Sequence, residues 1–464
     1  MSEVKNIDSQ VLGKLLQIAF SKGVFNQLSE EVADFEKMKI WTVGNPDGRE
    51  LRFSLKEGRG PSAIQWGSIA PASSGAAMPF PNPQRSLINE YTAKFKELDA
   101  TVELEYNLWK RMQKASSKYI SDALTMEVED KQMNARRRLC ADLYGDGTGI
   151  IGTIGTSGAA HSGGNLVLTI DAATGVRGHI GWFEFGEIMN VYADDTTKRL
   201  ASASDGTVEY LKVVDIDRAA KTVTFEAYSA AHAKLTVDGV GTIVDTDLVY
   251  REGQVTKYNV SSSITDDFNM ITEVMAGYES LFANDGRKVH GITMSGVTKG
   301  TVKDCSGATI DTPLLQSGFS LVKNIVGKDA YKYGSLLMAS EVLDMFYDGK
   351  EPDRRFNSAQ DNVRGGTKFS FLHGNDNIAL EESPYCPIQR MYAIPDAKSG
   401  KKILELYKTD FEPVRPGGQG SEYHLKPASG GGHEKYIRWY MTAMFSLLCK
   451  HPASVLVFKN FSLT

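Results

Sequence analysis

The stretch 119–154 predicts an unusually long helix that ends at a glycine turn. Apolar or small side chains recur there at helical spacing, and strong helix formers fill most other positions. Acidic residues come early and the arginines at 136–138 come late, as the helix dipole favours. A helix over 123–144 would be about 33 Å long at about 1.5 Å per residue. Gly145 is predicted to end the helix in the left-handed conformation. We call this helix the strut, because other elements must lie along a helix of this length.

The composition is that of a globular protein, with 41% hydrophobic and 23% charged residues in 464. This length predicts about two to four structural units with a sizeable core. A net charge of -5 argues against a general basic field that coats nucleic acid. The polar N-terminus is not a signal peptide, and no apolar run is long enough to span a membrane. The four cysteines are scattered, which favours reduced, buried thiols in a cytosolic product.

The first part of the chain predicts two arms. Residues 1–45 have a helical apolar stripe, whereas 51–55 and 102–108 alternate as strands do. The segment between these strands is rich in Gly, Pro, Ser and Ala, so we interpret 46–110 as a long two-stranded arm with an irregular tip. Its alternative is a disordered linker. Three large apolar residues at the tip would be exposed on a monomer and suit contact with another chain, namely Trp66, Met78 and Phe80.

The rest of the chain predicts a β-rich middle and a mixed remainder. Alternating strands within 160–260, with a hairpin turn at 217–221, predict a small barrel or sandwich. A helix is expected at 314–326, and a strand followed by a helix at 333–346. Further strands are predicted at 369–371, 403–407, 436–448 and 455–458.

Motif searches indicate no catalytic, cofactor or metal site. Residues 147–152 match GxGxxG, but they follow a helix and lead into strands, which is the reverse of the dinucleotide-binding context. Ser320 to Lys323 match SxxK without the companion motifs, so we interpret them as a solvated helix face. Asp376 is predicted to lie in a turn rather than a calcium loop. Carboxylate pairs distant in sequence would leave no such mark.

Three stretches in order, 135–153, 271–286 and 451–461, resemble segments of a known family. Together with the helical arm, the hairpin arm and the strut helix, they resemble the major capsid protein of tailed bacteriophages. That head fold is named after the phage Hong Kong 97, and the resemblance covers nearly the whole chain.

The resemblance implies an α+β fold with an N-arm, an extended β-hairpin loop, a long spine helix, peripheral and axial domains, and a small all-β insertion. Its parts would be the arm at 1–45, the extended loop at 46–110, the spine helix and peripheral domain at 111–150, the start of the axial domain with a β-barrel-like insertion at 151–265, and the axial domain with the return to the peripheral domain at 266–464.

The resemblance also implies a structural function. Copies would form hexamers and pentamers of an icosahedral shell around double-stranded DNA, held by weak non-specific contact. The protein would be assembled in the host bacterial cytoplasm and found in the virion, without a membrane. Partners would be a portal, decoration proteins and, because little chain precedes the loop, a separate scaffolding protein. No enzyme activity and no cofactor are expected.

The extended loop supplies the expected intersubunit contacts, because in this family it lies across the neighbouring subunit. The residues proposed for this contact are Arg52, Lys56, Arg59, Trp66, Met78 and Phe80. Some members form Lys–Asn cross-links helped by a Glu. Lys56, Asn357, Asn362 and Glu351 could be compared with that set, but no motif aligns them with it.

Two other classes remain open at this point. The β-rich middle would also suit another phage structural protein, such as a tail component or an adhesin. A polysaccharide-active enzyme with distant carboxylates is the second alternative. Closed shells, tubes or trimers, and glycan turnover respectively would distinguish the three.

Overall fold

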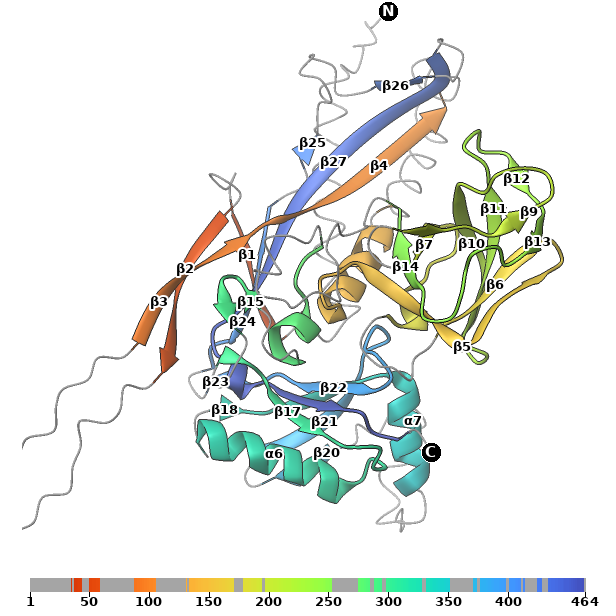
Figure 1. Cartoon of the computed structure of the whole chain (residues 1–464). Helices are drawn as coiled ribbons and strands as arrows, with labels where there is room; N and C mark the ends of the chain where they lie inside the picture. Colours follow the sequence, from red (N-terminus) through yellow and green to blue (C-terminus); the bar gives the residue numbers. More distant parts are fainter. Residues whose placement is uncertain are drawn as a thin grey trace, which may run out of the picture.

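The computed structural model shows a strand-rich α+β chain with a barrel, a mixed sheet and two long projecting β-ribbons (Figure 1). The described residues are 35, 37–43, 50–58, 87–105, 131, 133–170, 178–193, 197–252, 274–283, 288–293, 298–327, 331–350, 370–373, 376–397, 400–409, 412–413, 424–427 and 433–462.

The C-terminal part of the strut is helical over 133–144, as predicted, while 123–130 lie outside the described residues. Its inward face buries Ala135, Leu139 and Leu143. The prediction for Gly145 was wrong, because this residue is not left-handed and its N–H closes a tight turn on the Asp142 carbonyl at 3.2 Å. The left-handed residues are the next glycines of the GxGxxG stretch at 147 and 149, with φ of 80° and 79°. That stretch is therefore a turn into the first strand of the barrel.

The β-rich middle is a closed barrel. Its strands follow the order β10-β11-β6-β5-β14-β7, and pairing of β7 with β10 closes the circle. These strands are β5 (Ile150–Ser162), β6 (Asn165–Ile170), β7 (Ile188–Tyr192), β10 (Tyr210–Asp217), β11 (Thr222–Tyr228) and β14 (Leu248–Arg251). Side chains alternate between buried and partly exposed along β6 and β11, so one face fills the interior. The predicted barrel and its β10–β11 hairpin are confirmed.

Short elements complete the barrel region. They are η2 (Ile180–Trp182), β8 (Lys198–Arg199), β9 (Ser202–Ala203), β12 (Lys234–Leu235) and β13 (Val237–Gly239). His179 caps η2, since its Nδ1 accepts a hydrogen bond from the Gly181 N–H at 3.0 Å.

A second unit is a mixed sheet in the order β17-β28-β22-β19-β21-β20. Its strands are β17 (Thr301–Asp304), β19 (Ser335–Met338), β20 (Ser370–His373), β21 (Asp376–Glu382), β22 (Arg390–Ala393) and β28 (Leu456–Lys459). Helix α6 (Thr312–Val326) lies along it, and α7 (Ser340–Lys350) stands at one end (Figure 1). Asp311 caps α6 by accepting from the Leu314 N–H at 2.7 Å. Buried Phe319 packs on Tyr333 and Phe458, at centroid distances of 5.3 and 6.3 Å.

The third unit is a sheet built on β27 (His433–Cys449). Strand β1 (Met38–Thr42) pairs in parallel with β24 (Leu404–Lys408), which pairs with β27, and β4 (Lys96–Glu105) pairs with β27 over a long ribbon. Two short strands, β25 (Glu412–Pro413) and β26 (His424–Pro427), also pair with β27. The expectation of a helical arm through residue 45 was wrong for β1, while 1–34 lie outside the described residues.

The predicted pairing within the extended arm was also wrong. Strand β2 (Glu50–Gly58) pairs with β3 (Leu87–Lys94), and not with the strand that follows. That following strand, β4, continues from β3 after Phe95 and leaves to join β27. The remaining elements are η3 (Glu279–Ala283), β15 (Lys288–Val289), β16 (Ile292–Thr293), β18 (Tyr331–Lys332), β23 (Asp396–Ala397) and η7 (Pro452–Ser454).

Two large hydrophobic cores hold these units, beside a small cluster of Ile150, Leu248 and Tyr250. One runs through the barrel, the strut helix and the β27 sheet, and the other lies between the mixed sheet and its helices. All four cysteines are buried and free, as expected for structural thiols. Among the described helices, none combines the length and apolar character that crossing a membrane requires.

Candidate self-association surfaces

The β2–β3 hairpin projects from the body of the molecule (Figure 1). Its base is fixed by ring contacts. The Phe53 ring lies 6.0 Å from that of Tyr91 and meets the buried His290 ring edge-on at 6.2 Å. Tyr91 and Ala93 are buried, whereas Arg52 and Ser54 on the other face of β2 are exposed. The hairpin is thus anchored at its base and presents a polar face there.

The structure places only part of the predicted contact set. Arg52 lies exposed on β2, opposite Thr92. The backbone of Lys56 pairs opposite Ile88 further along the same strand. The other four proposed residues, Arg59, Trp66, Met78 and Phe80, lie outside the described residues, as do Glu351, Asn357 and Asn362. Contact through these side chains therefore stays a prediction.

The β4–β27 ribbon is a second projection, with pairing from Phe445 opposite Lys96 out to Tyr436 opposite Glu105 (Figure 1). The short strands β25 and β26 pair with the other edge of β27, so parts of this ribbon have three strands. Both ribbons begin in the packed body, because Phe95 and Phe445 are buried where they leave it. Such arms gain stability if they lie on another chain.

Exposed apolar side chains occur on the body as well. Leu321 and Ile325 are 38% and 52% exposed, and their spacing of four places them on one outer face of α6. The described residues include three more large exposed apolar side chains, Trp41, Phe185 and Val244. Scattered exposed apolar residues are common, but a pair on one helix face suits burial against a partner. The sequence pattern places both residues on the apolar face of the predicted helix, and the structure exposes them instead.

Ion pairs fix the strut helix to the barrel. The buried Arg251 guanidinium of β14 lies 3.4 Å from Asp142 and 3.2 Å from Glu187, and it donates to the Trp182 carbonyl at 2.9 Å. Arg137 on the helix pairs with Glu184 at 3.2 Å. Burial raises the pKa of Asp142 despite the nearby arginines. The barrel is thus attached through a cluster of charges with little solvent around it.

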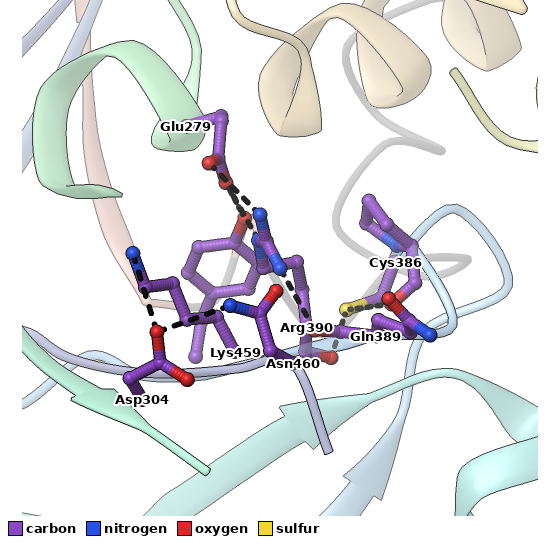
Figure 2. A network of polar contacts seen from close by, with 9 residues as sticks. Glu279, Asp304, Cys386, Gln389, Arg390, Lys459 and Asn460 are labelled. Carbon is purple, nitrogen blue, oxygen red and sulfur yellow. Dashed lines mark hydrogen bonds and ion pairs between the residues drawn. The ribbon is translucent and has the colours of Figure 1, made fainter. Parts of the chain in front are cut away.

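A second buried network joins the mixed sheet to η3, in the segment that follows the barrel (Figure 2). Arg390 of β22 makes a two-point contact with Glu279, at 3.1 and 3.4 Å, and the Tyr392 hydroxyl donates to the same carboxylate at 2.9 Å. The Cys386 thiol donates to the Arg390 carbonyl at 3.3 Å. Burial, and then the Glu279 charge, raises the pKa of Tyr392 well above its usual value. A tyrosine held neutral in this way serves as a structural donor.

The motifs set aside in the sequence have structural roles here. Lys323 of the SxxK stretch pairs with Asp376 at 3.0 Å, linking α6 to β21. Within the described ranges, no group of three or more His, Cys, Asp or Glu side chains is placed to hold a metal ion.

Comparisons with known proteins give structural matches alone. No family model matches the chain, and no curated protein sequence matches it. The chain is similar to phage capsid proteins. A cyanophage A-1(L) capsid asymmetric unit matches with a TM-score of 0.47 and 8% identity, covering 93% of each chain. The capsid of a native GTA particle matches with a TM-score of 0.41 and 10% identity, covering 92% of this chain and 89% of that one. A virus-like particle from Pyrococcus furiosus matches with a TM-score of 0.36 and 6% identity, over 97% and 99%.

Proposed function

We propose that this chain is the major capsid protein of a tailed phage, assembling into hexamers and pentamers of an icosahedral shell around double-stranded DNA. The observation that carries the proposal is the β2–β3 hairpin, which is anchored by Phe53, Tyr91 and His290 and projects away from its own subunit. A projecting hairpin needs a second chain to bury it. A shell of repeated copies supplies such a neighbour at every position.

The order of parts supports the same proposal. The sequence resemblance implied an arm, an extended hairpin, a spine helix, a β insertion and an α/β remainder. Four of these elements follow one another here in β2–β3, the helix at 133–144, the barrel and the mixed sheet. We therefore assign 1–45 to the arm, 46–110 apart from β4 to the extended loop, and 111–150 to the spine helix and peripheral domain. The start of the axial domain with the β insertion is assigned to 151–265, and the axial domain with the return to the peripheral domain to 266–464.

The role is structural rather than enzymatic, and its place is the virion after assembly in the host cytoplasm. Its further partners in this proposal are a separate scaffolding protein, a portal and decoration proteins. The six contact residues named from the sequence belong to the proposal as well, with Arg52 on the exposed face of β2 as the first to test.

Negative-stain microscopy with light scattering, on protein produced with and without a scaffolding partner, tests this function. Closed particles or ring-shaped capsomers support it. Tubes or compact trimers in both preparations would favour a tail component or an adhesin, for which the barrel would then be the main module.

A further inference from the structure

A cavity of about 590 Å³ lies where edge strand β1 meets the turns that precede β24 and follow β27. Its volume is within the range of about 300–1,000 Å³ of ligand pockets. Four lysines contribute to its lining, and we call it the basic pocket: Lys39, Lys401, Lys402 and Lys450. Trp41, Glu405 and His451 line it too.

The acidic group in the pocket is already engaged. Glu405 is 3% exposed, and its carboxylate accepts from Lys450 Nζ and from the Tyr407 hydroxyl, each at 2.8 Å. Burial opposes its ionisation, but these hydrogen bonds hold the pKa of Glu405 below its usual value. It therefore remains ionised, pairs with Lys450, and as one negative charge offsets one of the four lysine charges.

The other three lysines give the pocket its excess positive charge. Lys39 and Lys401 are exposed and Lys402 is half-buried, and none of them makes an ion pair with a described residue. The chain as a whole carries a net charge of -5, so this concentration of cations is a local feature. Like charges repel, and a bound anion relieves that repulsion.

Trp41 holds one of these charges in place. The Lys39 ammonium lies 3.6 Å from the centroid of the Trp41 ring, and the two residues share a face of β1. The Trp41 ring in turn stacks on Tyr407, with centroids 6.4 Å apart and planes 12° from parallel. A cation–π contact of this kind is attractive even at a partly exposed site. It keeps the Lys39 ammonium over the sheet and beside the pocket, which lowers the entropy lost on binding.

The lining favours an anion that is held by charge. Arginine makes paired hydrogen bonds to carboxylates and phosphates alike, and none is among the described residues that line the pocket. Lysine binds phosphate as a point charge, without a directional code. We propose that the basic pocket binds phosphate groups of a nucleic-acid backbone, independently of sequence. This inference rests on the proposed function in one respect, because packaged DNA is then the nucleic acid concerned.

The test is the salt dependence of DNA binding by the purified full-length protein, measured by fluorescence anisotropy of a short labelled duplex. The variant is Lys39→Ala/Lys401→Ala/Lys402→Ala. The logarithm of the association constant for DNA decreases linearly with the logarithm of the salt concentration. The magnitude of this slope should be smaller in the variant by about 0.9 for each lysine that contacts a phosphate. At low salt the affinity should fall at least tenfold. A matched control removes three exposed cations elsewhere, Arg218→Ala/Lys234→Ala/Lys288→Ala, and should keep the parental slope.

Four results would overturn the inference. The pocket variant could keep the parental salt slope. The pocket variant and the control variant could also show equal reductions of the slope, which would indicate a diffuse charge effect. Polyglutamate could bind the pocket more tightly than DNA, which would indicate an acidic protein segment. Inorganic phosphate serves as a competitor, and tight phosphate binding without DNA binding would also contradict a nucleic-acid ligand.

Particle formation is scored on the same proteins by microscopy. Shells that form from the pocket variant while DNA affinity falls would support both proposals. A parental protein that never forms shells would overturn the proposed function. A salt slope that depends on the three lysines would still support DNA binding by the basic pocket.

Discussion

The Glu279 carboxylate and the Arg390 guanidinium form a two-point ion pair that is almost sealed from solvent, with exposures of 3% and 2%. Its position is at the boundary of the two cores. Tyr392 packs in the core of the strut and the barrel, while its neighbours Met391 and Ala393 pack in the core of the mixed sheet. Strand β22 thus contributes side chains to both cores, and the ion pair fixes it to η3.

Removing one partner of this pair should destabilise the protein strongly. Arg390→Met leaves a buried unpaired carboxylate, and we expect a loss of about 3–5 kcal/mol in the free energy of unfolding. Tyr392→Phe removes one hydrogen bond to the same carboxylate and should cost about 1 kcal/mol. Chemical denaturation of both variants measures the difference. A loss in Arg390→Met no larger than that in Tyr392→Phe would show that the pair does not hold the boundary.

Gly277 is required where the strut ends. A Cβ there would meet three backbone carbonyl oxygens at 2.4–2.6 Å, those of Asp142, Leu143 and Gly145. Backbone cannot move aside as a flexible side chain can, so Gly277→Ala should cost about 2–3 kcal/mol, the upper part of the range for overpacking. Gly334→Ala is the matched control, because a Cβ at that position meets nothing within 4 Å. Equal melting temperatures for the two variants would contradict this packing.

Acid should weaken the anchor of the extended hairpin. Burial lowers the pKa of His290 to about 4, and its neutral ring donates from Nε2 to the Leu447 carbonyl at 2.9 Å. The unfolded chain takes up the proton near pH 6.5, before the folded one does. The stabilisation is therefore complete above pH 6.5 and is lost as the pH falls towards 4, by about 3 kcal/mol.

Denaturation at several pH values checks this expectation. His290→Gln should flatten the fall in stability between pH 6.5 and 4, and His161→Gln, at an exposed position, should leave it unchanged. His179 is buried and its pKa is also lowered to about 4, so part of the acid dependence should persist in the His290 variant. An unchanged pH profile in that variant would contradict the assignment.

Shell closure should depend on the tip of the extended loop. Deleting residues 60–84 removes Trp66, Met78 and Phe80 while sparing all of β2 and β3. We expect a soluble protein that no longer forms closed particles, because its neighbour loses an apolar contact. Arg52→Ala should lower particle yield to a lesser degree, with Arg218→Ala as the control. Intact shells from the deletion variant, seen by microscopy, would exclude the loop as the closing contact.

Elements with a local signal could be predicted from the sequence. Helix α6 has an apolar stripe and an aspartate cap, and the β10–β11 hairpin has alternating strands joined at a turn whose Asp217 carboxylate accepts from the Ala219 and Ala220 N–H groups. The end of the strut helix at residue 144 could be predicted from Gly145, which follows it. The sequence could not predict which glycine adopts the left-handed conformation. The Gly277 segment packs against that end of the helix and sets its geometry.

Partners distant in sequence could not be predicted. Strand β1 pairs with β24, more than three hundred positions later, and nothing in its own five residues specifies that neighbour. Strand β4 alternates as expected, yet its partner is β27 and not β2. The Glu279–Arg390 pair and the basic pocket likewise combine residues from separate parts of the chain. Single-sequence patterns carry no information on such contacts.

The most direct measurement is negative-stain microscopy, with light scattering, of the full-length protein produced together with a scaffolding partner. The account predicts closed shells of uniform size, or ring-shaped hexamers and pentamers on the way to them. Tubes, compact trimers or a monomer under that condition would contradict a capsid role.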